Sequence, residues 1–166
     1  MVRGERIYSS PEFGMIDPQL GEFLQEGLGI HVGTRNEQLE PNGARAIAVK
    51  VEDDGVHIVV YVAKVAIDRL MPDLEANAQA AITFARPTDE RACQVKGTYV
   101  ASRTARANER ALVAGQFERF LLNLERIGIP RGGTANWATW PAVAIRLRVT
   151  AVFDQTPGPA AGTTIA

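Results

Sequence analysis

The sequence predicts a mostly β protein: an antiparallel barrel of six strands with helices packed outside it. Six segments are apolar and rich in the β-branched residues that favour strands. The links between most of these segments read as short turns rather than the helical crossovers that a parallel sheet needs. Only three helices are indicated, which is too few for a doubly wound sheet.

The first predicted element is a short helix that starts after Asp17. Aspartate is a good N-cap, Pro18 suits the first helical position, and Gly27 can end the helix. A first strand is then expected at residues 29–34.

The next two strands form a predicted hairpin. Residues 44–52 alternate, and the Asp54-Gly55 turn signal leads into residues 56–63, which are almost wholly apolar and should be buried on both faces. Regular alternation in the first of these strands gives one face with Arg45, Ile47, Val49 and Val51 and another with Ala46, Ala48 and Lys50.

The middle of the chain predicts a helix and two strands. The helix covers residues 67–77, with Pro72 near its start. The strands cover residues 79–86 and 91–102, and Gly97 in the second marks a bulge or a close approach of another backbone.

Residues 105–127 carry the clearest helical pattern. Its apolar stripe consists of Val113, Phe117, Phe120, Leu121, Leu124 and Ile127. A loop with two tryptophans leads to a last strand at 142–153. We therefore expect one domain over residues 1–153, followed by a Gly/Pro-rich tail at 154–166 that is extended or mobile.

Composition excludes several functional classes. The 166 residues suit one domain, and 18 lysines and arginines against 19 acidic residues give no basic excess for nucleic acid or an anionic membrane. No stretch is apolar enough to span a membrane, and the N-terminal residues lack the apolar core of a signal peptide. Cys93 is the one cysteine, so no internal disulfide forms, and we expect a cytoplasmic protein.

The motifs of the common catalytic machines are absent. There is no phosphate loop, dinucleotide fingerprint, nucleophile elbow or zinc-protease helix in the sequence. Cys93 is expected to be a buried thiol, and His31 and His57 to be ordinary sheet residues. One cysteine and two histidines do not supply the usual zinc site. We therefore predict no metal and name no catalytic residue.

Cations inside apolar strands are more informative. They are Arg45, Lys50, Lys96, Arg146 and Arg148. A buried cation needs a partner, which is either an internal carboxylate or an anionic ligand such as a phosphate. Few acidic residues lie in these strands, which tilts the choice toward a ligand or a partner subunit. A spacing of five places Arg45 and Lys50 on opposite faces unless a bulge intervenes.

One of these cation pairs belongs to a longer pattern. Arg45 and Lys50 share a strand, Tyr61 lies in the next, residues 77–84 form a helix end and a strand, and Glu90-Arg91 opens a strand that reaches Gly97. Over residues 17–153 this order resembles the pyridoxamine 5'-phosphate oxidase-like FMN-binding split-barrel superfamily. The resemblance implies a six-stranded Greek-key split barrel, a homodimer, and FMN in the groove between subunits.

The resemblance also implies which residues hold the cofactor. They are Arg45, Ala46, Ile47, Ala48, Val49, Lys50, Tyr61, Val62, Ala63, Lys64 and Arg91. Cations suit the phosphate, and main-chain donors beside small side chains suit a flat ring. Trp137 and Trp140 either pack in the core or a subunit contact, or cap the flavin pocket.

Two departures separate the chain from a true pyridoxamine phosphate oxidase. Ala92 stands where those enzymes have a glutamine, and no histidine follows His57, so that the substrate-gripping Arg-Leu-His element is missing. We therefore expect an FMN-binding flavoprotein, an oxidoreductase that transfers hydride or electrons to a small redox substrate of unknown identity. The alternatives are a non-enzymatic flavin- or haem-binding protein, and a structural dimer whose strand cations are neutralised across the interface.

Overall fold

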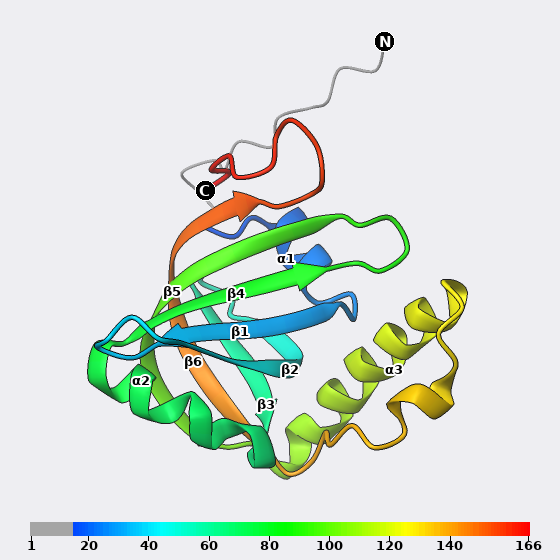
Figure 1. The fold of residues 1–166 in the computed structure, drawn as a ribbon, viewed down its shortest axis with the longest axis horizontal. Coiled ribbons are helices and arrows are strands. Elements are labelled where there is room, and N and C mark those ends of the chain that lie inside the picture. The colour runs from blue at the N-terminus through cyan, green and yellow to red at the C-terminus, as the bar shows by residue number, and fades with distance from the viewer. Residues whose placement is uncertain (1–14) are drawn as a thin grey trace.

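The computed structural model describes residues 15–166 and shows six antiparallel strands closed into a barrel in the order β1–β2–β3–β6–β5–β4 (Figure 1). The strands are β1 (Gly29–Arg35), β2 (Pro41–Val51), β3 (His57–Ala63), β4 (Gln79–Ala85), β5 (Ala92–Thr104) and β6 (Ala142–Asp154). Each of the six predicted strands is present, and β3 is buried on both faces from its second residue onward.

The helices agree with the sequence in number and place. They are α1 (Pro18–Leu24), the 3-10 turn η1 (Lys64–Arg69), α2 (Met71–Asn77), the turn η2 (Ala107–Glu109), α3 (Arg110–Arg126) and the turn η3 (Arg131–Thr134). Asp17 caps α1 as predicted, accepting a hydrogen bond from the Leu20 amide at 2.8 Å. The helix expected at 67–77 is divided, because Pro72 lies in the first turn of α2 and the chain before it forms η1. None of the described helices is long and apolar enough to cross a membrane.

Short helices plug the two ends of the barrel. Phe23 and Leu24 of α1 enter the main core from one end, while Leu70 and Leu74 enter it from the η1–α2 end (Figure 1). All four side chains are at most 2% exposed. The barrel interior is therefore filled by side chains, and any ligand has to lie on its outside.

Strand β2 pairs with two neighbouring strands, one along each half of its length. Its first half, residues 41–46, pairs with β1, and its second half pairs with β3, with a shift of register between Ala46 and Ala48. Beyond Ala46 no strand among residues 15–166 lies beside the edge of β2 that faced β1. Two glutamine side chains complete this edge: Gln116 bonds both backbone groups of Val49 at 3.0 and 2.7 Å, and Gln25 accepts from the Val51 amide at 3.1 Å.

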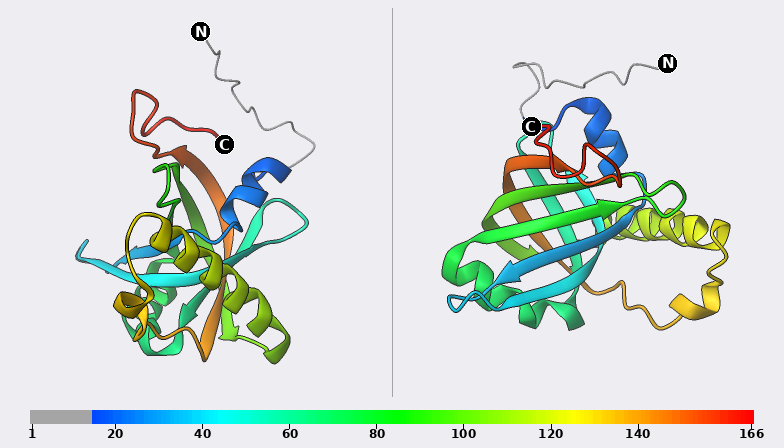
Figure 2. Two further views of the ribbon diagram at one scale, coloured as in Figure 1. Left: turned by 90° about the vertical axis from the view of Figure 1, so that its right-hand side faces the viewer. Right: turned by 45° about the horizontal axis from the view of Figure 1, so that its top comes forward.

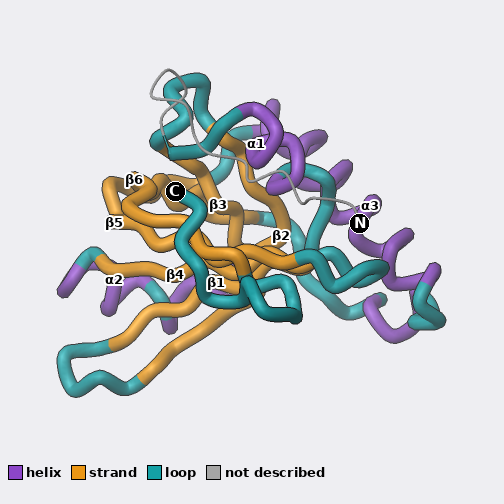
Figure 3. The backbone as a smooth tube through the Cα atoms, turned by 90° about the horizontal axis from the view of Figure 1, so that it is seen from above, coloured by secondary structure: helices purple, strands orange, loops and turns teal. Residues whose placement is uncertain are grey.

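Helix α3 lies along the side of the barrel, opposite α2, and residues 127–141 run back from its far end to β6 (Figures 2 and 3). Val113, Gln116, Phe120 and Leu124 are its buried residues. The stripe predicted from sequence included Ile127, which is 47% exposed. That prediction is wrong because α3 ends at Arg126, so Ile127 has left the face that packs on the barrel.

The C-terminal segment folds back instead of extending away. Phe153 pairs with Thr164, and the Val152 amide donates to the Ala166 carbonyl at 2.6 Å. The Gly/Pro-rich tail therefore lies against the end of β6 (Figure 1). The expectation that the N-terminus lacks a signal peptide concerns residues 1–14, which lie outside the described part of the chain.

Cys93 is the buried thiol that the strand pattern predicted. It is 3% exposed, belongs to the main core, and burial raises its pKa to about 12. The thiol is therefore protonated at neutral pH and plays no nucleophilic part.

Gly97 marks both a shift of register and a close approach of backbones, which were the two readings of its place in the sequence. A Cβ at this position would lie 2.9 Å from the Arg148 carbonyl oxygen and 3.4 Å from the Leu147 Cβ. The register of β5 against β6 shifts between Lys96 and Gly97. Here β5 and β6 approach too closely for any side chain.

We predict that Gly97→Ala lowers the free energy of unfolding by roughly 1–3 kcal/mol, because the added methyl group has to push one strand off its neighbour. Gly132→Ala is the matched control, since no atom of the described residues lies within 4 Å of a Cβ placed there. Urea unfolding followed by circular dichroism measures both variants. Equal stabilities for the two would show that the contact at Gly97 is not restrictive.

Candidate functional site

The register shift in β2 decides which of its side chains share a face. Ala46 and Val49 both point into the main core, whereas Ile47 and Ala48 both belong to a second apolar cluster outside the barrel. The regular alternation predicted from sequence is therefore wrong beyond Ala46, because the bulge adds one residue between two inward-facing positions. As a result Arg45 and Lys50, which regular alternation would separate, lie on the same outer face.

Arg45 is the most unusual cation of this face. Its guanidinium carbon lies 3.8 Å from the centre of the Trp137 ring and 5.3 Å from that of Phe120. The residue is half-buried, and among residues 15–166 its guanidinium has no hydrogen bond and no ion pair. Burial lowers its pKa from the usual value.

The neighbour of Arg45 in β1 also lacks a negative charge. His31 lies directly across the ladder from Arg45. The pKa of His31 is lowered, first by loss of surrounding water and second by the charge of Arg45. The imidazole is therefore neutral at physiological pH and leaves the arginine uncompensated.

The other cations assigned to a phosphate lie in different surroundings. Lys50 and Lys64 are exposed to solvent at the end of β2 and the start of η1. Arg91 does not join Arg45, because its guanidinium lies over the Phe23 ring of α1 at 4.2 Å. The structure thus brings Arg45 and Lys50 to one face and places Arg91 in another contact.

The part of the outer face between Arg45 and Lys50 is a shelf of small and apolar side chains, and it is covered. The shelf consists of Ile47, Ala48, Val59, Tyr61, Ala63, Ala142 and Ala144, each at most 8% exposed. Leu112 and Phe117 of α3, together with Trp140, pack over it. Of the other residues assigned to the cofactor, Ala46, Val49 and Val62 face the barrel interior.

Tyr61 joins the shelf to the start of α3. Its hydroxyl donates to Glu109 Oε1 at 2.9 Å, and burial, followed by this hydrogen bond, raises its pKa. Glu109 also accepts two hydrogen bonds from Arg103, at 2.7 and 2.8 Å, and one from the Arg106 amide at 2.7 Å. Chiefly through Arg103, the pKa of Glu109 falls to about 2. Tyr61 therefore acts as a strut between β3 and the residues that lead into α3.

The remaining strand cations are satisfied without a ligand. Arg146 makes a two-pronged ion pair with Glu52, with both distances 2.8 Å. Lys96 is exposed and lies 5.0 Å from the Phe153 ring, and Arg148 is exposed. Of the five strand cations, Arg146 is therefore compensated by an internal carboxylate, whereas Lys50, Lys96 and Arg148 are solvated.

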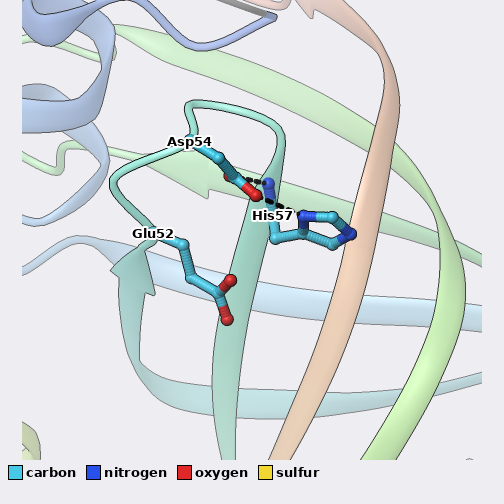
Figure 4. Close-up of side chains that lie close together, drawn as sticks. All are labelled: Glu52, Asp54 and His57. Carbon is cyan, nitrogen blue, oxygen red and sulfur yellow. Dashed lines mark hydrogen bonds and ion pairs between the residues drawn. The ribbon is translucent and has the colours of Figure 1, made fainter.

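A cluster of three ligand-type side chains at the β2–β3 turn is explained by the turn itself. Asp54 accepts hydrogen bonds from the backbone of Val56 and His57 and from His57 Nδ1 at 2.6 Å (Figure 4). Glu52 lies in the same cluster, but its carboxylate is held by Arg146. These contacts close the hairpin and require no metal.

A surface cleft of about 420 Å³ lies between α3 and the β4–β5 turn. Arg86 crosses it and pairs with Glu26 and Asp89, while Arg119 donates to the backbone carbonyls of Gln25 and Glu26. The arginines lining the cleft thus have partners within the chain, and the cleft is separate from Arg45.

Comparison with known proteins establishes the fold of this chain. No family model matches the chain, and no curated protein matches it. HupZ of Group A Streptococcus is 18% identical over 89% of this chain and 100% of its own, with a TM-score of 0.53. A suggested pyridoxamine 5'-phosphate oxidase from Lactobacillus delbrueckii is 12% identical over 84% and 93%, with a TM-score of 0.51. An FMN-binding protein from Syntrophomonas wolfei is 11% identical over 81% and 82%, with a TM-score of 0.50.

The chain has the split-barrel fold. This confirms the architecture that the sequence resemblance implied, including the antiparallel barrel with helices outside. At these identities the likeness establishes the fold, and function has to be argued from the residues themselves.

Sequence reasoning missed two residues and one contact that organise this region. Gln116 was not singled out, although a polar residue between Val113 and Phe120 on the buried stripe of a helix was a usable signal. Glu109 carried no signal, because its partners Tyr61 and Arg103 are brought to it only by the fold. The stacking of Arg45 on Phe120 and Trp137 was invisible for the same reason.

We predict that Gln116→Met lowers the free energy of unfolding by roughly 2–4 kcal/mol, because it leaves the buried N–H and C=O of Val49 unpaired. Gln19→Met on the exposed surface of α1 is the control, with an expected change within about 0.5 kcal/mol. Urea unfolding compares the two. A Gln116→Met protein as stable as the control would show that the edge of β2 needs no partner.

We further predict that Glu109→Gln destabilises the protein at pH 6 and that the difference from wild type narrows at pH 3.5. The folded state keeps Glu109 ionised down to about pH 2, whereas an unfolded carboxyl protonates near 4.5. The contribution of Glu109 is therefore complete above that unfolded value and is lost as the pH falls toward 2. Urea unfolding of both proteins at the two pH values measures the gap; a gap that does not change with pH would contradict the assignment.

Proposed function

We propose that this protein binds FMN on the outer face of β2, with the phosphate at Arg45. The observation that carries the proposal is the half-buried Arg45 guanidinium, which has no carboxylate partner among the described residues and shares its face with Lys50. A phosphate monoester supplies the negative charge and the paired oxygens that a guanidinium binds. The split-barrel fold, also seen in an FMN-binding protein from Syntrophomonas wolfei, supports this choice of ligand.

The two ends of FMN fit this face unequally. Among the described residues neither Arg45 nor Lys50 forms an ion pair, and both offer cationic groups that suit the phosphate. Ala48 and Tyr61, which the resemblance assigns to the flavin ring, are fully buried beneath residues of α3 and Trp140. The phosphate end therefore fits the residues as they stand, whereas a ring reaches the shelf only if its cover moves aside.

As an enzyme, the protein would be an oxidoreductase acting on a small redox substrate. Bound FMN supplies hydride or electron transfer, and the chain contributes binding and orientation. Tyr61 is unsuited to proton transfer, because its hydroxyl is bonded to Glu109 and its pKa is raised. Cys93 is protonated and buried in the core.

We also propose that the protein is a cytoplasmic homodimer. Its cofactor site would lie at the subunit interface. Leu122, Ile127 and Ile129 support it, because they leave apolar surface at the outer end of α3 and just beyond it, each 41–47% exposed. A partner subunit on this side would also cover residues 127–141, which project from the barrel (Figure 2).

We predict that the purified protein retains added FMN with quenched flavin fluorescence, and that Arg45→Ala combined with Lys50→Ala weakens binding roughly 10- to 100-fold, as expected for losing charge-assisted hydrogen bonds. Arg148→Ala combined with Lys96→Ala removes the same charges from exposed strand positions and should leave binding within about twofold. Fluorescence titration gives the Kd values. Equal losses in both double variants would refute the phosphate site, and sedimentation equilibrium of the same sample tests the dimer.

The covered shelf favours a second candidate, a flavin- or haem-binding protein without catalysis. A ligand held under Trp140 and the start of α3 would have little open surface on which a substrate could stack. Retention of haem in place of FMN supports this candidate, as does retained FMN that no electron donor reduces. If neither ligand is retained, the oxidoreductase proposal is excluded.

A further inference from the structure

The Arg45 guanidinium lies beside two aromatic rings that stack on each other. The Trp137 and Phe120 rings are nearly parallel, with an interplanar angle of 17° and centroids 6.3 Å apart. The guanidinium carbon lies 3.8 Å from the Trp137 ring centre and 5.3 Å from that of Phe120, and Phe117 packs against Trp137 with its ring tilted by 51°. We call Trp137 and Phe120 together the aromatic clamp.

Stacking restrains a guanidinium without using its hydrogen-bond donors. The attraction acts through the face of the planar group, whereas its five N–H bonds point outward in the plane. Among the described residues no acceptor bonds to these groups, and no unpartnered side-chain nitrogen is fully buried. The donor edge of Arg45 is therefore held in orientation and remains open to a ligand from solvent.

The two rings of the aromatic clamp are held by different parts of the fold. Phe120 is fixed on α3, where its ring lies 3.4 Å from the position a Cβ of Gly29 would occupy. Trp137 belongs to the segment between α3 and β6, and its amide donates to the carbonyl of the buried Thr134 at 3.0 Å. The segment carrying Trp137 thus contacts the barrel at Arg45 as well as at the shelf, where Trp140 packs.

We propose that Trp137 and Phe120 are positioning residues, which hold Arg45 as a preformed hydrogen-bond donor to a phosphate monoester. The inference rests on the proposed function and deepens it, because it states how the site selects its ligand. A flat guanidinium presented edge-on binds two phosphate oxygens at once, which a lysine cannot do. The site therefore prefers FMN to riboflavin, which has the same ring and lacks the phosphate.

The first test compares FMN with riboflavin by fluorescence titration. The wild type should prefer FMN by about tenfold or more. Arg45→Lys keeps the charge and Trp137→Leu removes one aromatic ring of the clamp. Both variants should reduce the preference for FMN over riboflavin severalfold. Trp137→Phe should keep most of the preference, because an aromatic ring remains at this position. Arg148→Lys, at an exposed strand position outside the site, is the control. Circular dichroism confirms that each variant folds.

The second test does not depend on flavin. In the Trp140→Phe protein Trp137 is the one remaining tryptophan, and inorganic phosphate should change its emission while sodium chloride of equal ionic strength should not. The change should vanish when Arg45→Ala is added. Phosphate is used because FMN itself would quench tryptophan.

The outcomes separate the two proposals. An FMN preference that survives both Arg45→Lys and Trp137→Leu overturns the clamp and leaves FMN binding intact. A phosphate effect on Trp137 that requires Arg45, in a protein that retains no flavin, overturns the proposed function and supports the clamp. Trp137 emission that does not respond to phosphate overturns the clamp.

Discussion

The open edge of β2 is the constraint on which the rest of the structure depends. Strand β2 pairs with β1 and then with β3, so some of its backbone N–H and C=O groups have no strand beside them in the described part of the chain. Such groups need partners. Gln116 and Gln25 supply those partners and so tie α3 and the end of α1 to the barrel. Once α3 is fixed there, Phe120 lies against Arg45 and Phe117 covers the shelf.

The fold could be predicted because its signals are local. Strand periodicity, the turn at Asp54-Gly55, the Asp17 cap and the close approach at Gly97 each depend on a few neighbouring residues, and each is present in the structure. Which side chains of β2 point into the barrel could not be predicted in the same way. Ile47, Ala48 and Val49 are all apolar, so a bulge among them leaves no trace in the hydrophobic pattern.

The candidate site was predictable only in part. A cation inside an apolar strand singled out Arg45, but its contacts with Phe120 and Trp137 join segments far apart in the chain. Tyr61 shows the opposite case, because the family resemblance assigned it to the cofactor, whereas its hydroxyl is bonded to Glu109. Long-range packing, rather than local preference, determined what these side chains touch.

The strand cations differ in what compensates them, and this difference is the strongest argument for a site. Arg146 is neutralised by Glu52, while Lys96 and Arg148 keep their water. Arg45 alone among these strand cations loses part of its water without gaining a carboxylate in the described chain. Stacking on aromatic rings contributes about 0.5–2 kcal/mol and offsets only part of that loss. This unmet requirement at Arg45, met at the other strand cations, is the reason we propose an anion-binding site at that position.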